Sequence, residues 1–149
     1  MRLCIPAGDS SSILKFSTSF EDCRHLLELA KSLGVEVIGI SFHVVTGCQN
    51  PQIFTHSIAD ARLVFAMAEK LGCKMHVLDI GGGFPGTEDG IVCFEEFADV
   101  TTSALNKYFP ENCRVEVITE PGRYYVESAF LLPARIIGKK DGVEASCGK

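Results

Sequence analysis

Residues 75–86 read MHVLDIGGGFPG, a short apolar run that ends in a cluster of glycines. An apolar run of this length, bounded by turn-forming residues, is typical of a strand that is buried on both faces of a sheet. Strands of this kind belong to parallel sheets, whose carboxyl-terminal edge binds ligands. The stretch therefore predicts an α/β fold with a glycine-rich loop at its ligand-binding edge.

Strand-like and helix-like patterns alternate along the rest of the chain. The predicted strands cover residues 3–5, 35–40, 75–80 and 115–118, with a weaker fifth at 129–137 that Pro133 interrupts. The predicted helices run from a cap at Ser19 through Ala30, over 53–71 and over 94–108, and Gly34 and Gly72 end the first two. This alternation predicts a parallel sheet covered by helices.

The length of the chain limits the architecture. A closed (β/α)8 barrel needs about 250 residues, whereas this chain has 149 and only half of the required units. Spacing alone therefore favours an open three-layer sandwich, with helices on both faces of the sheet.

Composition excludes several functional classes. The chain is 46% hydrophobic, so it is not a disordered tail. Its 14 basic and 19 acidic residues give a net charge of −5, without the basic surface that nucleic-acid binding needs. No apolar run approaches the ~20 residues of a membrane span. Seven scattered cysteines show no metal-binding spacing, which predicts reduced thiols, a cytoplasmic protein and no metal site.

Unusual residues follow three of the predicted strands. His43 follows the second strand, Gly81, Gly82 and Gly83 follow the third, and Glu120, Gly122 and Arg123 follow the fourth. Each has a simpler explanation when taken alone: a structural histidine, a tight turn, a solvated carboxylate, or a guanidinium lying over the neighbouring tyrosines.

The glycine cluster fits the pattern G-x-G-x-x-G through Gly81, Gly83 and Gly86. A dinucleotide-binding motif requires a helix to begin within this pattern. Pro85 and residues 88–90 separate the glycines from the next predicted helix, so a dinucleotide site is disfavoured. A cradle for a single phosphate and a simple turn both remain open.

Four stretches together resemble the group IV pyridoxal-phosphate decarboxylases, the family of ornithine decarboxylase and its non-catalytic paralogues, the antizyme inhibitors. They are CRHLLE at 23–28, SIADAR at 57–62, LDIGGGFPG at 78–86 and EPGRYYV at 120–126. The resemblance covers nearly the whole chain. It implies that residues 1–149 are an internal piece, about half, of the family's alanine-racemase-like (β/α)8 TIM barrel, without its C-terminal β domain. This barrel assignment replaces the sandwich that spacing alone favours.

The resemblance also implies a binding site for pyridoxal 5'-phosphate. His43 would stack on the pyridine ring and Glu120 would pair with the ring nitrogen. The phosphate would be held by three sets of groups: the amides of Gly81, Gly82 and Gly83, the Thr46 hydroxyl, and Arg123 with the adjoining Gly122. Val45 replaces a family glycine in the loop after His43, and there a valine would resist positive φ.

The implied activity is decarboxylation of a basic amino acid, as in the conversion of ornithine to putrescine in polyamine biosynthesis. In the family, the Schiff-base lysine lies upstream of Met1, and the catalytic cysteine and substrate-binding aspartates lie beyond Lys149. The chain is therefore expected to hold no complete catalytic set and to be inactive alone, and the full-length family member is expected to be a homodimer. One alternative is a non-catalytic regulator that binds antizyme, which Val45 favours and Arg123 disfavours. Another is an inert product of a pseudogene or of a mis-assembled gene.

Overall fold

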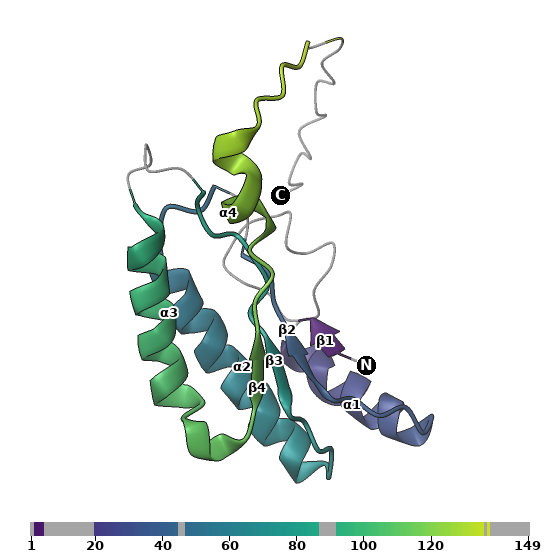
Figure 1. The fold of residues 1–149 in the computed structure, drawn as a ribbon. Helices are drawn as coiled ribbons and strands as arrows, with labels where there is room; N and C mark the ends of the chain where they lie inside the picture. The colour runs from purple at the N-terminus through teal and green to yellow at the C-terminus, as the bar shows by residue number, and fades with distance from the viewer. Residues whose placement is uncertain (1, 5–19, 45–46, 87–91, 136, 138–149) are drawn as a thin grey trace, which may run out of the picture.

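The chain forms a four-stranded parallel sheet in the order β1-β2-β3-β4 (Figure 1). The computed structural model describes residues 2–4, 20–44, 47–86, 92–135 and 137. The strands are β1 (Arg2–Cys4), β2 (Gly39–Ser41), β3 (Val77–Asp79) and β4 (Glu116–Ile118). The helices are α1 (Phe20–Ser32), α2 (Gln52–Lys70), α3 (Phe94–Tyr108) and the short α4 (Gly122–Val126), with 3-10 turns η2 (Glu111–Cys113) and η3 (Glu127–Ala129).

All four main strands overlap the predicted runs. β2, β3 and β4 are shorter than predicted, whereas β1 has the predicted length and begins one residue earlier. The register aligns Leu3, Ile40, Leu78 and Val117 across the sheet. Residues 35–38 precede this alignment, so β2 begins at Gly39 rather than at residue 35. Ser19 and Ile5 lie outside the described residues.

The predicted glycine ends of α1 and α2 are confirmed. Gly34 has φ +66° and Gly72 has φ +79°, the left-handed conformation that glycine adopts most readily. After α1, the N–H of Val35 donates to the carbonyl of Ala30 at 2.8 Å, and the N–H of Gly34 donates to Lys31 at 3.1 Å. These bonds satisfy carbonyls that the end of a helix would otherwise leave unpaired.

The three-layer sandwich expected from spacing alone is wrong. Each strand pairs with the next strand along the chain, and right-handed crossovers then place every connecting helix on the same face of the sheet. Accordingly, α1, α2 and α3 form a single layer, in which α2 packs against both neighbours (Figure 1). One layer of sheet and one of helix is the arrangement of a (β/α)8 barrel segment.

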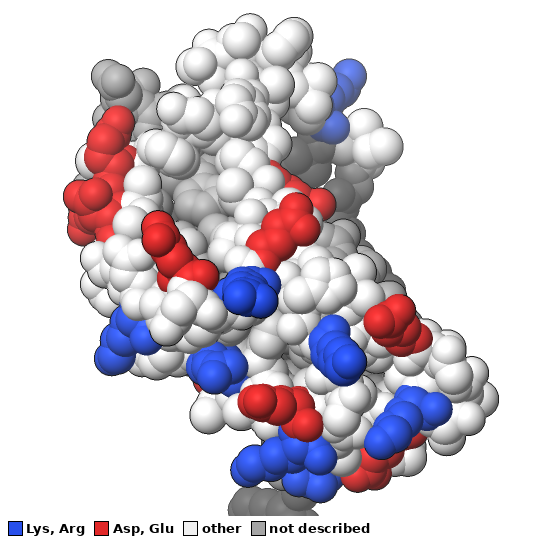
Figure 2. Space-filling model, turned by 60° about the horizontal axis from the view of Figure 1, so that its bottom comes forward, with Lys and Arg blue, Asp and Glu red and all other residues white. Residues whose placement is uncertain are grey.

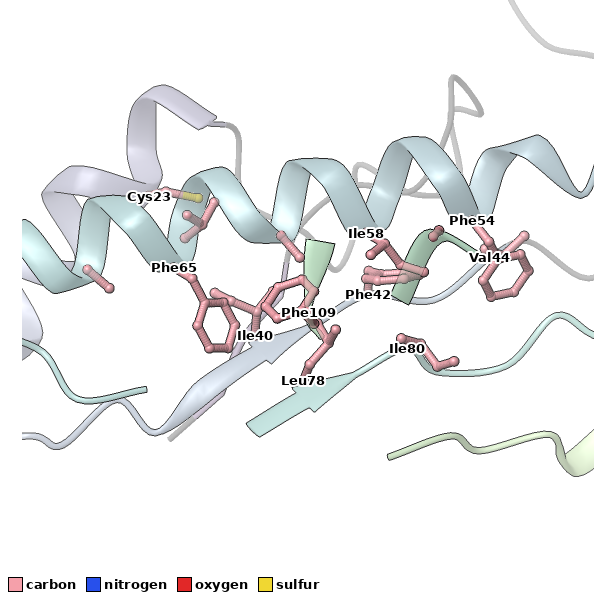
Figure 3. Close-up of a cluster of buried hydrophobic side chains, with 14 of the residues drawn as sticks. Cys23, Ile40, Phe42, Val44, Phe54, Ile58, Phe65, Leu78, Ile80 and Phe109 are labelled. Atoms are coloured by element: carbon pink, nitrogen blue, oxygen red, sulfur yellow. The ribbon is translucent and has the colours of Figure 1, made fainter. Parts of the chain in front are cut away.

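The core lies between the sheet and α2. Ile40, Phe42, Leu78 and Ile80 point from the sheet side toward this helix (Figure 3). Phe84, just after the glycines, stacks on Phe54 of α2 with ring centroids 4.7 Å apart. This contact anchors the glycine-rich loop to the helix layer.

The predicted fifth strand is wrong for the described part of residues 129–137. Ala129 ends η3, and residues 130–135 form no regular structure. Pro133 has no N–H to donate to a ladder, and no described strand lies alongside the segment. Its apolar side chains consequently face solvent, with Phe130 78% and Leu131 94% exposed.

Candidate functional site

Hydrogen bonds join the segments that follow the carboxyl ends of β2, β3 and β4. The N–H of Gly82, after β3, donates to Nδ1 of His43, after β2, at 3.2 Å. The N–H of Glu120, after β4, donates to the carbonyl of Gly81 at 2.7 Å. The structure therefore brings together the imidazole, the glycines and the carboxylate at one edge of the sheet.

Glycine is required at this junction because backbone and ring atoms approach too closely for a side chain. A Cβ atom on Gly82 would lie 2.7 Å from the carbonyl oxygen of Glu120 and 3.2 Å from Cε1 of His43. Gly81 has φ +60°, and a Cβ atom there would lie 2.2 Å from the Phe42 carbonyl oxygen. The glycines let three strand ends converge on one point.

Asp79, at the end of β3, holds the first glycine in place. Its side chain is fully buried. Oδ1 accepts a hydrogen bond from the N–H of Gly81 at 2.8 Å, and Oδ2 accepts one from the Ser41 hydroxyl at 3.1 Å. The sequence signal for this role is a lone carboxylate inside an apolar run, a position where an unpaired acidic side chain is rare.

Several polar groups at this edge face outward. The side chains of His43 and Glu120 are exposed, and the Glu120 carboxylate bonds to no described residue.

The amides of Gly81 and Gly82 are already paired within the protein, whereas the amide of Gly83 has no partner among the described residues. Thr46 and Val45 lie outside the described residues.

Arg123 pairs with a carboxylate of its own chain. Its Nη2 donates to Oε1 of Glu127, whose Oε2 accepts a hydrogen bond from the N–H of Gly86 at 2.8 Å. The hydrogen bond from Arg123 lowers the pKa of Glu127, and the same bond raises the pKa of Arg123. Gly122 donates its N–H to the carbonyl of Glu120 at 2.8 Å.

The described lysines lie at the other end of the molecule. Lys31, Lys70 and Lys107 occupy the last turns of α1, α2 and α3, and Lys74 precedes β3. Figure 2 shows basic side chains, interspersed with acidic ones, on the face at the bottom of Figure 1, away from α4. Thus none of these four amines reaches the edge that holds His43 and Glu120.

Two further site types find no support in the part of the chain that the structure describes. No cluster of three or more histidine, cysteine, aspartate or glutamate side chains there could hold a metal ion. No described helix has both the length and the apolar character to cross a membrane.

Comparison with known families identifies the class of protein. Residues 5–127 match the model of the pyridoxal-dependent decarboxylases, specifically their pyridoxal binding domain. The chain belongs to this family. Its fold is a segment of the family's barrel, and pyridoxal phosphate is the family's cofactor.

Two curated relatives represent different members of the family. Human antizyme inhibitor 2 is 58% identical over 145 residues, which are 95% of this chain and 32% of that protein. Mouse ornithine decarboxylase is 51% identical over 142 residues, or 93% of this chain and 31% of that protein. The chain thus spans about a third of the length of these relatives.

Solved structures agree with this assignment. The arginine decarboxylase of Paramecium bursaria Chlorella virus matches with a TM-score of 0.75 at 38% identity, covering 84% of this chain and 34% of that one. Ornithine decarboxylase from Entamoeba histolytica matches with a TM-score of 0.67 at 34% identity, over 83% of this chain and 33% of that one.

The residues at the strand ends fit pyridoxal phosphate. The cofactor has a flat ring, a ring nitrogen that can be protonated, and a phosphate. The edge offers the exposed imidazole of His43, whose ring lies beside Gly82. It also offers the exposed side chain of Glu120, whose carboxylate bonds to no described residue and whose backbone carbonyl lies beside Gly82. The Gly83 amide has no partner among the described residues, and Arg123 supplies a guanidinium that also bonds to Glu127. Each part of the cofactor therefore has a chemically matched group.

Proposed function

We propose that this chain supplies part of the pyridoxal-phosphate site of an ornithine-decarboxylase-like protein. In the whole protein, this site would serve decarboxylation of a basic amino acid, ornithine to putrescine in polyamine synthesis. The observation that supports the proposal most directly is that Gly82 lies between the His43 ring and the Glu120 backbone. This arrangement brings the His43 ring to the same edge of the sheet as Glu120, whose carboxylate bonds to no described residue.

Glu120 would accept a hydrogen bond from the protonated ring nitrogen. When bound, the cofactor supplies an electron sink that stabilises the carbanion left by loss of carbon dioxide. A carboxylate at the nitrogen keeps that proton in place, because a charge-assisted hydrogen bond favours the charged form. The carboxylate is exposed and unengaged by described residues, so it needs no rearrangement to take this role.

His43 would contact the face of the ring. Its Nδ1 atom is fixed by the Gly82 amide, which limits rotation of the imidazole. A ring held in one orientation offers a flat surface for stacking at small entropic cost. The phosphate would be held by the Gly83 amide, the Arg123 guanidinium and the Thr46 hydroxyl. Gly122 would shape the turn before Arg123.

The chain alone would not complete the chemistry. The family's reaction needs a lysine amine at the cofactor, whereas the four described lysines lie in the last turns of α1, α2 and α3 and just before β3, away from His43 and Glu120. We infer that other segments of a longer, cytoplasmic and homodimeric protein supply the lysine and the substrate contacts.

A second candidate is a non-catalytic regulator that acts by binding antizyme. Its support is the 58% identity to human antizyme inhibitor 2, compared with 51% to mouse ornithine decarboxylase. The presence of His43, Glu120 and Arg123 favours the cofactor-binding proposal instead, because a protein that only binds a partner has no need of this combination of groups.

A titration of the chain with pyridoxal phosphate tests the proposal. We expect saturable and reversible binding, seen as a change in cofactor absorbance, which Arg123→Ala and His43→Ala weaken. Carboxyl-labelled ornithine should release no labelled carbon dioxide above a blank without protein. Absence of saturable binding would refute the site, and release of labelled carbon dioxide would refute the claim of inactivity. Capture of purified antizyme without cofactor binding would favour the regulator.

A further inference from the structure

We propose that Arg123 and the N–H of Gly86 form an oxyanion site, which the carboxylate of Glu127 fills and for which it competes with the cofactor phosphate. The inference rests on the proposed function, because it concerns the phosphate end of the same site. It assigns Glu127 the role of setting the affinity of the chain for phosphate groups.

The two carboxylate oxygens of Glu127 accept hydrogen bonds from the same kinds of donor that hold a bound phosphate. Oε1 accepts a hydrogen bond from the Arg123 guanidinium, and Oε2 accepts one from the Gly86 amide at 2.8 Å. A guanidinium combined with a backbone amide is a common way to hold a phosphate. The chain thus presents phosphate-binding donors and occupies them with its own carboxylate.

The fold fixes Glu127 in this position. A Cβ atom on Gly86 would lie 2.8 Å from Cβ of Glu127 and 2.9 Å from the Arg123 carbonyl oxygen, so α4 and η3 pack directly on the glycine-rich loop. Tyr124 lies on Phe94 of α3 with ring centroids 4.2 Å apart, which attaches α4 to the helix layer. The Glu127 side chain is only 19% exposed.

Competition follows from this placement. A phosphate that is to bind Arg123 must first displace a carboxylate that makes two hydrogen bonds. The Arg123 side chain is 39% exposed, and ion pairs at such partly solvated sites are weak. Displacement is therefore feasible, and its cost lowers the phosphate affinity only a few-fold.

Charge-neutralising variants test this competition. Glu127→Gln keeps an oxygen for the Gly86 amide but removes the charge, and Glu127→Ala removes both. Both should bind pyridoxal phosphate about two- to fivefold more tightly than the unaltered chain. Glu96→Gln, which removes a carboxylate from the first turn of α3, is the matched control and should leave binding unchanged.

The sign of the effect separates competition from simple support of the loop. If Glu127 only holds the loop in place, both variants will bind the cofactor more weakly, and Glu127→Ala will be the weaker of the two. Unchanged or weaker binding in Glu127→Gln would overturn the proposal.

Inorganic phosphate separates this inference from the proposed function. Its binding is followed by the nitrogen and proton resonances of the Arg123 side chain, a measurement that needs neither cofactor nor activity. If no form of the chain binds pyridoxal phosphate, the proposed function fails, and the competition is then judged on phosphate alone. A larger phosphate-induced shift in Glu127→Gln supports the competition, and an equal or smaller shift refutes it.

Discussion

The backbone N–H of Gly82 donates a hydrogen bond to Nδ1 of His43, over 3.2 Å between strand ends that are far apart in the sequence. Because Nδ1 accepts this bond, the neutral imidazole carries its proton on Nε2. No described residue bonds to Nε2. The contact therefore fixes both the tautomer and the orientation of the ring, and leaves one N–H available to a ligand.

We expect Gly82→Ala to disrupt the site. The added Cβ atom would collide with the Glu120 carbonyl oxygen and the His43 ring, so the ends of β2 and β4 must separate. Overpacking of this kind costs about 1–3 kcal/mol. Urea denaturation should show that loss in the free energy of unfolding, and binding of pyridoxal phosphate should weaken.

Gly122→Ala is the matched control for that substitution. A Cβ atom on Gly122 would meet nothing within 4 Å. The free energy of unfolding should stay within about 0.5 kcal/mol of that of the unaltered chain. Equal losses in the two variants would show that the close approach at Gly82 is not what makes glycine necessary there.

Asp79→Ala should destabilise the fold through the glycine turn. The change leaves the buried Gly81 amide and the half-buried Ser41 hydroxyl without their carboxylate partner. An unpaired buried group costs about 1–3 kcal/mol and a half-buried hydroxyl costs less, so the free energy of unfolding should fall by about 2–4 kcal/mol. Asp79→Asn keeps an acceptor for Gly81 and should cost less. If alanine and asparagine have the same effect, the hydrogen bonds are not the cause.

The sequence predicts the sheet well because strands and helices alternate with a clear apolar pattern. It also predicts the meeting of His43, the glycines and Glu120, since parallel strands end at one edge. It could not predict that the Gly81 and Gly82 amides are already used, because their partners, Asp79 and His43, are set by the register between strands. The Arg123–Glu127 pair spans one helical turn, yet its link to Gly86 depends on tertiary packing.

The fifth strand shows where pattern alone fails. Residues 130–132 are apolar, as in a strand, but strand formation needs a neighbour with free backbone groups. No described strand takes that place, and the segment remains exposed. A local pattern cannot reveal whether a pairing partner exists.

Glu120→Gln should lower kcat with little change in KM, tested in a protein completed with the missing segments of a related decarboxylase. The glutamine keeps the shape but removes the charge that holds the ring nitrogen protonated. Loss of one charge-assisted hydrogen bond, about 1.5–3 kcal/mol, corresponds to about 10–150-fold in rate. Arg123→Ala should instead raise the cofactor concentration needed for half activity. An unchanged kcat in Glu120→Gln would contradict the assigned role.

The bond between Glu127 and the Gly86 amide should persist below the pH at which an ordinary glutamate protonates. Arg123 lowers the pKa of Glu127 below the usual 4.5, so the bond is complete above that pH and is lost as the pH falls through the lowered value. The NMR chemical shift of the Gly86 amide proton, followed as the pH is lowered, should change with a midpoint below pH 4.5. Glu127→Gln should abolish this titration, and a midpoint at or above 4.5 would refute the pairing.

The apolar side chains after η3 should promote self-association. Leu131 and Leu132 are 94% and 89% exposed, and contiguous exposed apolar residues favour contacts between molecules. The double variant Leu131→Gln, Leu132→Gln should lower the mass measured by light scattering at a given protein concentration. Leu63→Gln, at a single exposed leucine on α2, is the control and should leave the mass unchanged.

The order β1-β2-β3-β4 has a consequence for how the chain is made. During synthesis from the amino terminus, each new strand finds its partner already complete, because that partner is the strand translated just before it. None of these four strands must wait for a distant segment, and the sheet can grow by one unit at a time on the ribosome. A substitution in β2 should therefore impair acquisition of structure by every later unit, whereas one in β4 should spare the units before it.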